Sequence, residues 1–553
     1  MMLRKPDWIR THSAKYRPLW MFCVFFSLTF GRYLYYGWKY FPQLDDYIQY
    51  GLQENQQERW RYITEQGLLK SRPLAGLTDE MIWSRLFGCM IISLAVLSLL
   101  YVGSAMLFEV VFRRYFGASA LFSLIYLLLP INFEGTYWIS ASSRIVPSLF
   151  FTALSGFLLV RLIECGKLWL LLPYCVSGLL SVGFYEQGLV LSLTYSLLIL
   201  LWNVRTLKEN RRPLFGLLSF GFVGAYFIFT SLQPASAYYG SRMVIHSWME
   251  PGYFADVFTP IFSSIVNISG KGTFLTYAKG FKRGLSEIVC NPNWVWLSVM
   301  GVALVALFFL IRASKGEKRS AKEVARAVVF GLLLAMAPLS IFFVVGETPW
   351  FSCRNIVCSL PGAALIADVL FSAITRGNEW ILRAAAVLFA LGACVAGVSE
   401  SGDYMRTYEH DLMVAQAAAD CNEPAFKILN VRSRYLDDYN YIWNEHIHGA
   451  TESSWALSGA VKYLKKQEIN VVPLDICQGQ YYQQWNAASN RITAEESLYY
   501  YDPDANVMHK LTVVPCEDTP TECFALFYPD GSLCGYVTQT DTEGWFYTEY
   551  PFA

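Results

Sequence analysis

Long apolar stretches separated by short polar segments follow one another along most of the chain. A helix needs roughly 20 apolar residues to cross about 30 Å of hydrocarbon. Stretches of this kind begin near Leu19, Ile82, Ala118, Ile145, Leu168, Gly188, Leu214, Trp294, Val328, Ile356 and Ile381. The pattern predicts an α-helical polytopic membrane protein with about eleven transmembrane helices over residues 19–400. Because some stretches are closely spaced, the count is open by about one or two helices.

The composition supports a membrane protein rather than a soluble one. Of 553 residues, 54% are hydrophobic and only 16% are charged, which is too apolar for a soluble chain of this length. The lipid bilayer is therefore the expected main solvent. Lysine plus arginine and aspartate plus glutamate number 44 each, so no excess of positive charge indicates a nucleic-acid partner.

Basic residues in the short loops predict the orientation. With residues 1–18 in the cytoplasm, most lysines and arginines of the short loops fall on the cytoplasmic side, as the positive-inside rule requires. The first apolar run lacks a small-residue cleavage site, so we expect a retained first helix. An odd number of helices then places the C-terminus outside, in a multi-pass protein of the cell membrane. Two long loops, 38–81 and 232–292, also fall outside.

Residues 401–553 differ in character from the apolar region before them. The apolar runs shorten and turn signals such as PDG and DPDA appear, which predicts a small extracytoplasmic α/β domain. Its cysteines are compatible with disulfides in an oxidising compartment, and none has zinc-site spacing. Cys516 and Cys523 are near enough in sequence to pair, but the odd number leaves the connectivity open. The cysteines are Cys421, Cys477, Cys516, Cys523 and Cys534.

Two adjacent carboxylates, Asp45 and Asp46, follow the first predicted helix by only a few residues. On this dipeptide alone a solvated helix cap is the simpler interpretation, because Asp favours helix N-termini. A catalytic role requires partners from other outside segments.

Several outside segments supply charged and aromatic partners. Charged residues at membrane level usually face a cavity or a partner, whereas Trp and Tyr are common interfacial anchors and Arg can extend toward water. The anchor interpretation is favoured for Tyr137 and Trp138 taken singly, and function is favoured for Glu186 in its apolar hairpin. The candidates are Arg72 in the first loop, Glu134, Tyr137, Trp138 and Arg144 in EGTYWISASSR, Tyr185 and Glu186 in SVGFYEQGL, and Arg354 in CRNIVCSLP.

The second long loop, 232–292, is rich in aromatic residues with intermittent Lys and Arg, a pattern typical of interfacial amphipathic helices. The chain contains no P-loop, GxGxxG or GxSxG motif. Nucleotide-driven transport and a nucleophile-elbow hydrolase are therefore disfavoured.

In their order along the chain, the short motifs resemble the GT-C superfamily of polytopic glycosyltransferases, especially the bacterial branch that includes serotype-converting glucosyltransferases. The resemblance covers about residues 19–375 and leaves the tail after residue 401 unassigned. It consists of an acidic pair after the first helix (LDDY), an arginine later in the first outside loop (SRPL), an aromatic turn (EGTYW), a Gly-x-x-Glu turn (GFYEQ) and an arginine ahead of a Pro-bearing span (CRNIVCSLP).

The resemblance implies a GT-C-like catalytic domain over residues 19–400. It implies an enzyme that moves a sugar, a hexose, from a polyprenyl-phosphate donor to a glycan or another cell-surface acceptor outside the membrane. Asp45 or Asp46 would then be the general base of an inverting transfer. The residues expected to bind the donor phosphate are Arg72, Arg354 and Arg144.

Further roles follow from the same resemblance. Some GT-C enzymes place a divalent cation between carboxylates and the phosphate, so Asp46 and Glu186 are the candidate ligands for Mg or Mn, with metal dependence left open. The residues expected to bind substrate are Glu134, Tyr137, Trp138, Tyr185 and Glu186.

Other functions fit parts of the pattern. A transporter or lipid flippase also has many spans, but the sequence has no evident inverted repeat or Gly/Pro-broken helix pair in matching halves. A lipid-linked-oligosaccharide polymerase or ligase shares the lipid substrates and the large outside loops. A non-catalytic scaffold would bind a partner through its tail, and it would tolerate loss of Asp45.

We predict that the C-terminal tail is outside the cytoplasm, because this orientation leaves most short-loop lysines and arginines inside. A reporter fused after Ala553, or cysteine-accessibility labelling of the tail, measures its side directly. A cytoplasmic Ala553 would overturn the odd helix count and the assignment of every outside loop.

Overall fold

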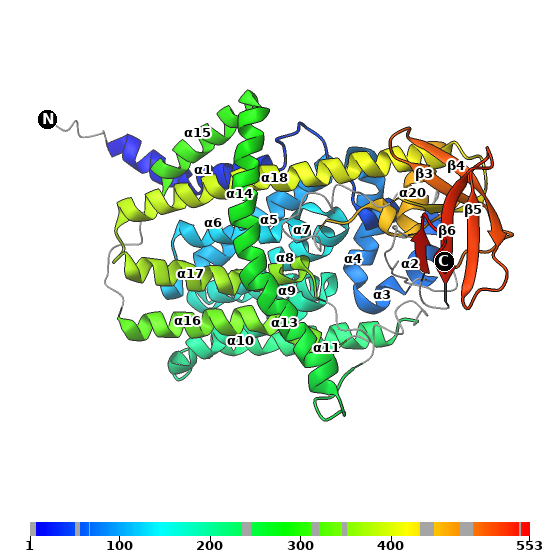
Figure 1. The fold of residues 1–553 in the computed structure, drawn as a ribbon. Helices are drawn as coiled ribbons and strands as arrows, with labels where there is room; N and C mark the ends of the chain where they lie inside the picture. Colours follow the sequence, from blue (N-terminus) through cyan, green and yellow to red (C-terminus); the bar gives the residue numbers. More distant parts are fainter. Residues whose placement is uncertain are drawn as a thin grey trace. The chain divides into compact units, whose positions relative to one another are not determined.

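Helices form along the apolar stretches of the chain, because a helix satisfies its own backbone hydrogen bonds where water is excluded. The computed structural model describes residues 7–49, 56–65, 67–234, 245–311, 320–345, 351–431, 447–474, 490–540 and 544–552 (Figure 1). The chain divides into two units. Unit 1 comprises Met1–Tyr40 and Asn55–Gly402, and unit 2 comprises Phe41–Glu54 and Asp403–Ala553.

Apolar helices dominate unit 1 and make the protein a multi-pass membrane protein. In the described part of the chain, 6 helices are long and apolar enough to cross a membrane, or up to 7 if a bent pair counts as one span. Three further apolar helices are shorter, at 10–17 residues. The expected count of about eleven is not confirmed by these lengths and stays a prediction.

The main helices of unit 1 follow the predicted apolar stretches. The apolar helical stretch Pro73–Phe116 begins before residue 81, so the last part of the expected loop 38–81 is helical. The helices are α1 (Asp7–Gly31), α2 (Gln56–Glu65), α3 (Leu68–Ser71), α4 (Pro73–Thr78), α5 (Met90–Phe116), α6 (Ala120–Leu128), α7 (Phe133–Tyr137), α8 (Ile139–Cys165), α9 (Leu171–Phe184), α10 (Glu186–Trp202), α11 (Leu218–Ser231), α13 (Thr259–Asn267), α14 (Thr273–Cys290), α15 (Trp294–Leu310), α16 (Ala321–Met336), α17 (Leu360–Ile374) and α18 (Glu379–Ala419), whose last residues belong to unit 2.

Small residues let α14 lie directly on α18, which it crosses steeply in Figure 1. A Cβ at Gly280 would lie 3.2 Å from the Ala396 Cβ, and one at Gly284 would lie 1.9 Å from the Val395 carbonyl oxygen. Close backbone approach through small residues is a common way to pack helices in membranes. Much of the segment 232–292, expected as a loop with interfacial helices, is therefore helix packed on the bundle.

Unit 2 contains one seven-stranded mixed sheet, in the order β2-β1-β3-β4-β5-β6-β7. Strand β1 pairs in parallel with β2 and β3, and the remaining neighbours are antiparallel. Helix α20 (Ser454–Lys465) connects β1 to β2, as a parallel pair requires a crossover. The strands are β1 (Ala425–Leu429), β2 (Asn470–Leu474), β3 (Leu498–Asp502), β4 (Val507–Pro515), β5 (Glu522–Phe527), β6 (Leu533–Gln539) and β7 (Gly544–Tyr547).

The sheet has an apolar core that includes Leu429, Leu498, Phe524, Leu526 and Val537. Burial of these side chains is the main force that holds the strands together.

The cysteines of unit 2 that the structure describes are free thiols. Cys516 and Cys523 face each other across the β4–β5 hairpin, where the Cys516 N–H donates to the Cys523 carbonyl at 2.9 Å. Cys477 lies outside the described residues. The structure therefore contains no disulfide between Cys516 and Cys523, the pair that their spacing made possible.

Candidate functional site

A broken helix forms one part of the candidate site. Helices α6 and α7 are bent by 53° at a short break. Pro130 follows this break, and proline disfavours helix at the residue before it. The Asn132 Nδ2 compensates for the lost helical bonds by donating to the carbonyl oxygens of Tyr126 at 3.2 Å and Leu127 at 3.0 Å. Since unsatisfied carbonyls are costly where water is excluded, this side chain lets the chain turn inside the bundle.

Gly135 lets α7 lie against η12 (Cys353–Ser359), the 3-10 segment that carries Arg354. A Cβ at Gly135 would come within 2.7 Å of Val357 Cγ2 and 3.2 Å of the Arg354 backbone. The fully buried Glu134 accepts the Arg354 backbone N–H at 2.8 Å, and its other oxygen lies 3.7 Å from Arg354 Nε. The Arg354 guanidinium lies 4.7 Å from the ring centre of Trp138. The close approach thus assembles a carboxylate, an indole and a guanidinium.

Arg72 and Glu186 form a second charged pair. The Arg72 Nε donates to both carboxylate oxygens of Glu186, at 2.8 and 2.7 Å. Arg72 lies between α3 and α4, and Glu186 is the first residue of α10. The Arg72 guanidinium also lies 4.9 Å from the ring centre of Tyr185. The carboxylate and the ring together define the orientation of the guanidinium.

Arg144 and Asp79 form a third pair. The Arg144 Nε lies 3.2 Å from Asp79 Oδ2, and the Ser143 hydroxyl donates to Asp79 Oδ1 at 2.7 Å. Asp79 begins the π-helical turn η2 (Asp79–Trp83), and the two donors are consecutive residues of α8. The aspartate therefore ties α8 to the start of the Pro73–Phe116 helical stretch.

The three pairs belong to one cluster. Segment η12, which carries Arg354, packs against α8, which carries Arg144, and against α10, which begins at Glu186. The exposed fraction of the side chain is 28% for Arg72, 26% for Arg144 and 21% for Arg354. The carboxylate partners Asp79 and Glu134 are almost fully buried. Partly exposed guanidinium groups, each held by a carboxylate, suit an anionic ligand rich in oxygen atoms, such as a phosphate. We call Arg72, Arg144, Arg354, Asp79, Glu134 and Glu186 the arginine–carboxylate cluster.

Tyr137 lies among aromatic side chains. Its ring centre lies 4.9 Å from that of Tyr40, 5.3 Å from that of Tyr33 and 5.5 Å from that of Phe133. The side chain is 1% exposed. Such packing holds α7 in place. A contact between Tyr137 and the substrate stays a prediction.

Asp45 and Asp46 lie in unit 2, in the 3-10 segment η1 (Leu44–Gln49). Asp46 is fully buried, and its Oδ2 accepts the Gln43 backbone N–H at 2.9 Å, a bond that reaches back to the residue before η1. Asp45 is partly exposed and accepts from the Trp455 Nε1 at 3.2 Å. Burial, with the nearby Asp411 carboxylate, raises the pKa of Tyr47 well above its ordinary value.

A joint role of Asp46 and Glu186 as ligands for Mg or Mn stays a prediction. They belong to different units, and both Glu186 oxygens already contact Arg72, so a cation there would have to displace a guanidinium. Across the described ranges, no group of three or more His, Cys, Asp or Glu side chains could hold a metal ion.

Sequence reasoning missed two residues of this region. Asp79 pairs with Arg144, and its signal was an acidic dipeptide at the start of an apolar stretch (LTDEMIW), similar to the one at Asp45. Arg32 is fully buried and bonds to Asn132, and its signal was an arginine directly after the first apolar run.

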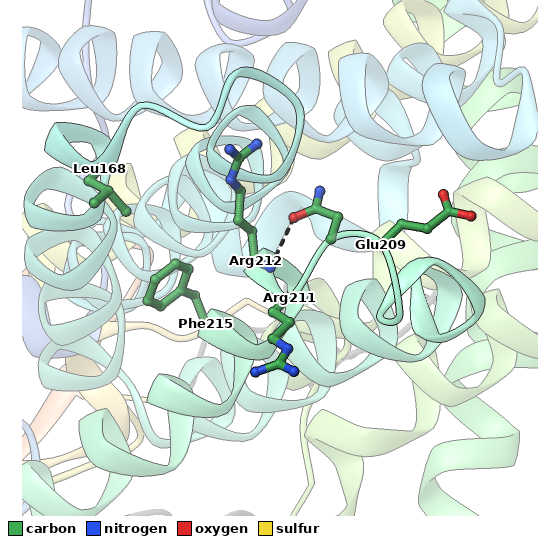
Figure 2. A pocket seen from close by; sticks show the side chains of 6 residues that line it. Leu168, Glu209, Arg211, Arg212 and Phe215 are labelled. Atoms are coloured by element: carbon green, nitrogen blue, oxygen red, sulfur yellow. Dashed lines mark hydrogen bonds between the residues drawn. The ribbon is translucent and has the colours of Figure 1, made fainter.

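A separate cleft of about 530 Å³ lies among Leu168, Glu209, Asn210, Arg211, Arg212 and Phe215. Figure 2 shows that Arg211 and Arg212 point in opposite directions from this cleft wall. The Arg212 guanidinium lies against Gly166, at the C-terminal end of α8, where a cation is favourable for the helix. The two arginines therefore do not converge on one anion.

Comparisons with known proteins find a similarity in structure and none in sequence. No protein-family model matches the chain, and a search of curated proteins finds no match. Among solved structures, the chain is similar to the crystal structure of ArnT from Cupriavidus metallidurans bound to undecaprenyl phosphate, at 12% sequence identity and a TM-score of 0.34. The similarity covers 84% of this chain and 86% of that chain. At so low a TM-score it carries no argument about function.

We predict that Gly135→Ala destabilises the protein, because the new methyl group pushes α7 away from η12. Overpacking of this kind costs about 1–3 kcal/mol, more than the roughly 0.5–1 kcal/mol that alanine gains over glycine in a helix. Gly221→Ala is the matched control, because a Cβ at Gly221 in α11 has nothing within 4 Å. Thermal unfolding of the purified variants measures the difference, and equal unfolding temperatures would show that the contact at Gly135 is loose.

Proposed function

We propose that this chain is a membrane glycosyltransferase of the GT-C type, which moves a sugar from a polyprenyl-phosphate donor to an acceptor outside the cytoplasm. The observation that carries the proposal is the arginine–carboxylate cluster of unit 1, with Arg72, Arg144 and Arg354 in one region. A lipid phosphate presents several oxygen atoms at the membrane boundary. Planar guanidinium groups bind such oxygens with two parallel hydrogen bonds.

The proposed reaction is an inverting transfer. The acceptor hydroxyl oxygen attacks the anomeric carbon of the sugar while the bond from that carbon to the phosphate oxygen breaks. The electron pair of this bond leaves with the polyprenyl phosphate, whose added negative charge the arginines stabilise. The hydroxyl proton passes to a carboxylate, which acts as general base. A carboxylate positioned in this way is the usual base of inverting sugar transfer.

Asp45 is the better candidate for the base of the two adjacent aspartates. It is partly exposed and accepts one indole N–H, from Trp455, whereas Asp46 is fully buried and bonded to the Gln43 backbone. A base must reach the acceptor hydroxyl, so a partly exposed carboxylate has the advantage. If neither aspartate is the base, Glu134 and Glu186 are the next carboxylates to test.

A lipid transporter is a second candidate function, and one observation favours it. Helices α6 and α7 form a broken pair, which the sequence did not reveal, and transporters use discontinuous helices at their binding sites. The described residues contain one such pair, whereas inverted repeats would provide two in matching halves. Release of free sugar or of glycosylated acceptor separates transfer from transport, because a transporter leaves its substrate intact.

We predict that Arg354→Lys impairs donor binding or turnover by about 10- to 100-fold, the value of a charged hydrogen bond in a site shielded from water. Lysine keeps the charge but loses the planar fork. Arg61→Lys is the matched control, because Arg61 also pairs through its Nε with a glutamate, Glu65, but is 74% exposed on α2. Binding of a polyprenyl phosphate by native mass spectrometry, together with sugar release from a polyprenyl-phosphate hexose, measures both effects. Unchanged donor binding and turnover in Arg354→Lys would show that Arg354 does not bind the donor.

We predict that Asp45→Asn abolishes most transfer while the protein still inserts and folds, because the amide keeps the size and loses the proton acceptor. General-base catalysis typically contributes about 10²- to 10⁴-fold, so a loss smaller than about tenfold would indicate a positioning role.

Asp46→Asn is the paired variant for this test. It should lower the thermal stability more than Asp45→Asn does, because Asp46 is the buried one. Normal transfer in both variants would exclude the pair as the base.

A further inference from the structure

Arg32 is a buried cation just after the end of α1. Its side chain is 1% exposed. The Nη2 atom donates to the Tyr33 hydroxyl at 2.6 Å, to Asn132 Oδ1 at 3.0 Å and to the Thr136 hydroxyl at 3.1 Å. The guanidinium also lies 4.8 Å from the ring centre of Tyr33 and 5.3 Å from that of Phe133. All these groups belong to unit 1.

The hydrogen-bond acceptors of this guanidinium among the described residues are neutral oxygens rather than carboxylates, and its Nε has no hydrogen-bond acceptor there. The arginines of the cluster differ, because each contacts a carboxylate. A charge buried without a counter-ion is expensive inside a membrane protein and usually marks a functional region. Neutral acceptors and aromatic faces offset part of the cost.

The acceptors of Arg32 lie on both sides of the break between α6 and α7. Asn132 uses its oxygen for Arg32 and its nitrogen for the open carbonyls at the end of α6. Thr136, on α7, donates to the Asn132 carbonyl at 2.9 Å and also contacts the Tyr33 hydroxyl at 2.8 Å. The guanidinium therefore bonds both to Asn132, which donates to the carbonyls at the break, and to Thr136 of the helix α7 that follows.

Two residues, one in α7 and one directly after it, contact Arg354. Glu134 and Trp138 lie on either side of Thr136 in the sequence, and both touch Arg354. Five residues are too few for a helix to hold its place by its own hydrogen bonds, so its position depends on contacts from outside. Arg32, the residue directly after α1, supplies such contacts.

We propose that Arg32 is a positioning residue for the arginine–carboxylate cluster. It holds α7 through Asn132 and Thr136, and in this way it presents Glu134 and Trp138 to Arg354. An effect of Arg32 on the binding of a phosphate ligand rests on the proposed function. An effect of Arg32 on the position of α7 does not. Arginine suits this position because its planar guanidinium lies against two aromatic rings while its Nη2 bonds to the three acceptors, and a lysine ammonium has no planar face to lie on the rings.

The test compares Arg32→Lys and Thr136→Val with Arg17→Lys. Thr136→Val keeps the shape of the side chain and removes its hydroxyl. Arg17 is the matched control, because it lies on the same helix α1 and donates its Nε to the Leu310 carbonyl at 3.0 Å, away from α7. Hydrogen exchange of peptides across residues 130–138 reports the local opening of α7. Binding of a short polyprenyl phosphate reports the site.

Both test variants should exchange faster across 130–138 and bind the polyprenyl phosphate at least about tenfold more weakly, and Arg17→Lys should change neither. Unchanged exchange in both test variants would overturn the proposal. If the wild-type protein binds no polyprenyl phosphate, the proposed function fails while the exchange measurement still decides the role of Arg32. If Arg32→Lys does not fold, Thr136→Val decides alone: faster local exchange in the folded variant supports the proposal, and native exchange rejects it.

Discussion

Asn132 donates to the backbone carbonyls of Tyr126 and Leu127 where α6 ends, and the Tyr101 hydroxyl also donates to that of Tyr126. The arrangement of the candidate site depends on these bonds. Inside a membrane bundle an open carbonyl has no water to accept from, so a helix can break only where another group replaces the lost bonds. Because the break is satisfied, the chain can turn at Pro130 and place the short helix α7 against η12. Glu134 and Trp138 reach Arg354 only in this arrangement.

The arginine–carboxylate cluster is a set of ion pairs that are partly buried, and such pairs seldom add much stability. Their value here is geometric, since a guanidinium held by a carboxylate keeps a defined direction. The three arginines come from the junction of α3 and α4, from α8 and from η12, so three distant segments contribute to the cluster. Gly135 contributes by its lack of a side chain, because α7 could not otherwise approach η12 so closely.

The adjacent aspartates illustrate how two neighbouring residues acquire different environments. Asp46 is fully buried and caps its own segment through the Gln43 N–H, while Asp45 is partly exposed and meets the indole of Trp455 from α20. Both belong to unit 2, although α1, the helix that precedes them in the sequence, belongs to unit 1. Gly459 makes this packing possible, since a Cβ there would lie 2.8 Å from the Tyr47 carbonyl oxygen.

The sequence by itself determined the membrane class of the protein, because apolar stretches of sufficient length leave few alternatives to helices in a bilayer. It also singled out Arg72, Arg144, Arg354, Glu134 and Glu186, since charges beside apolar stretches need partners. It did not pair them, and it missed Asp79 and Arg32, because pairing joins residues far apart in the chain. Only the tertiary structure decided these contacts, the break at α6 and the membership of Asp45 in unit 2, since each depends on which backbones pack closely.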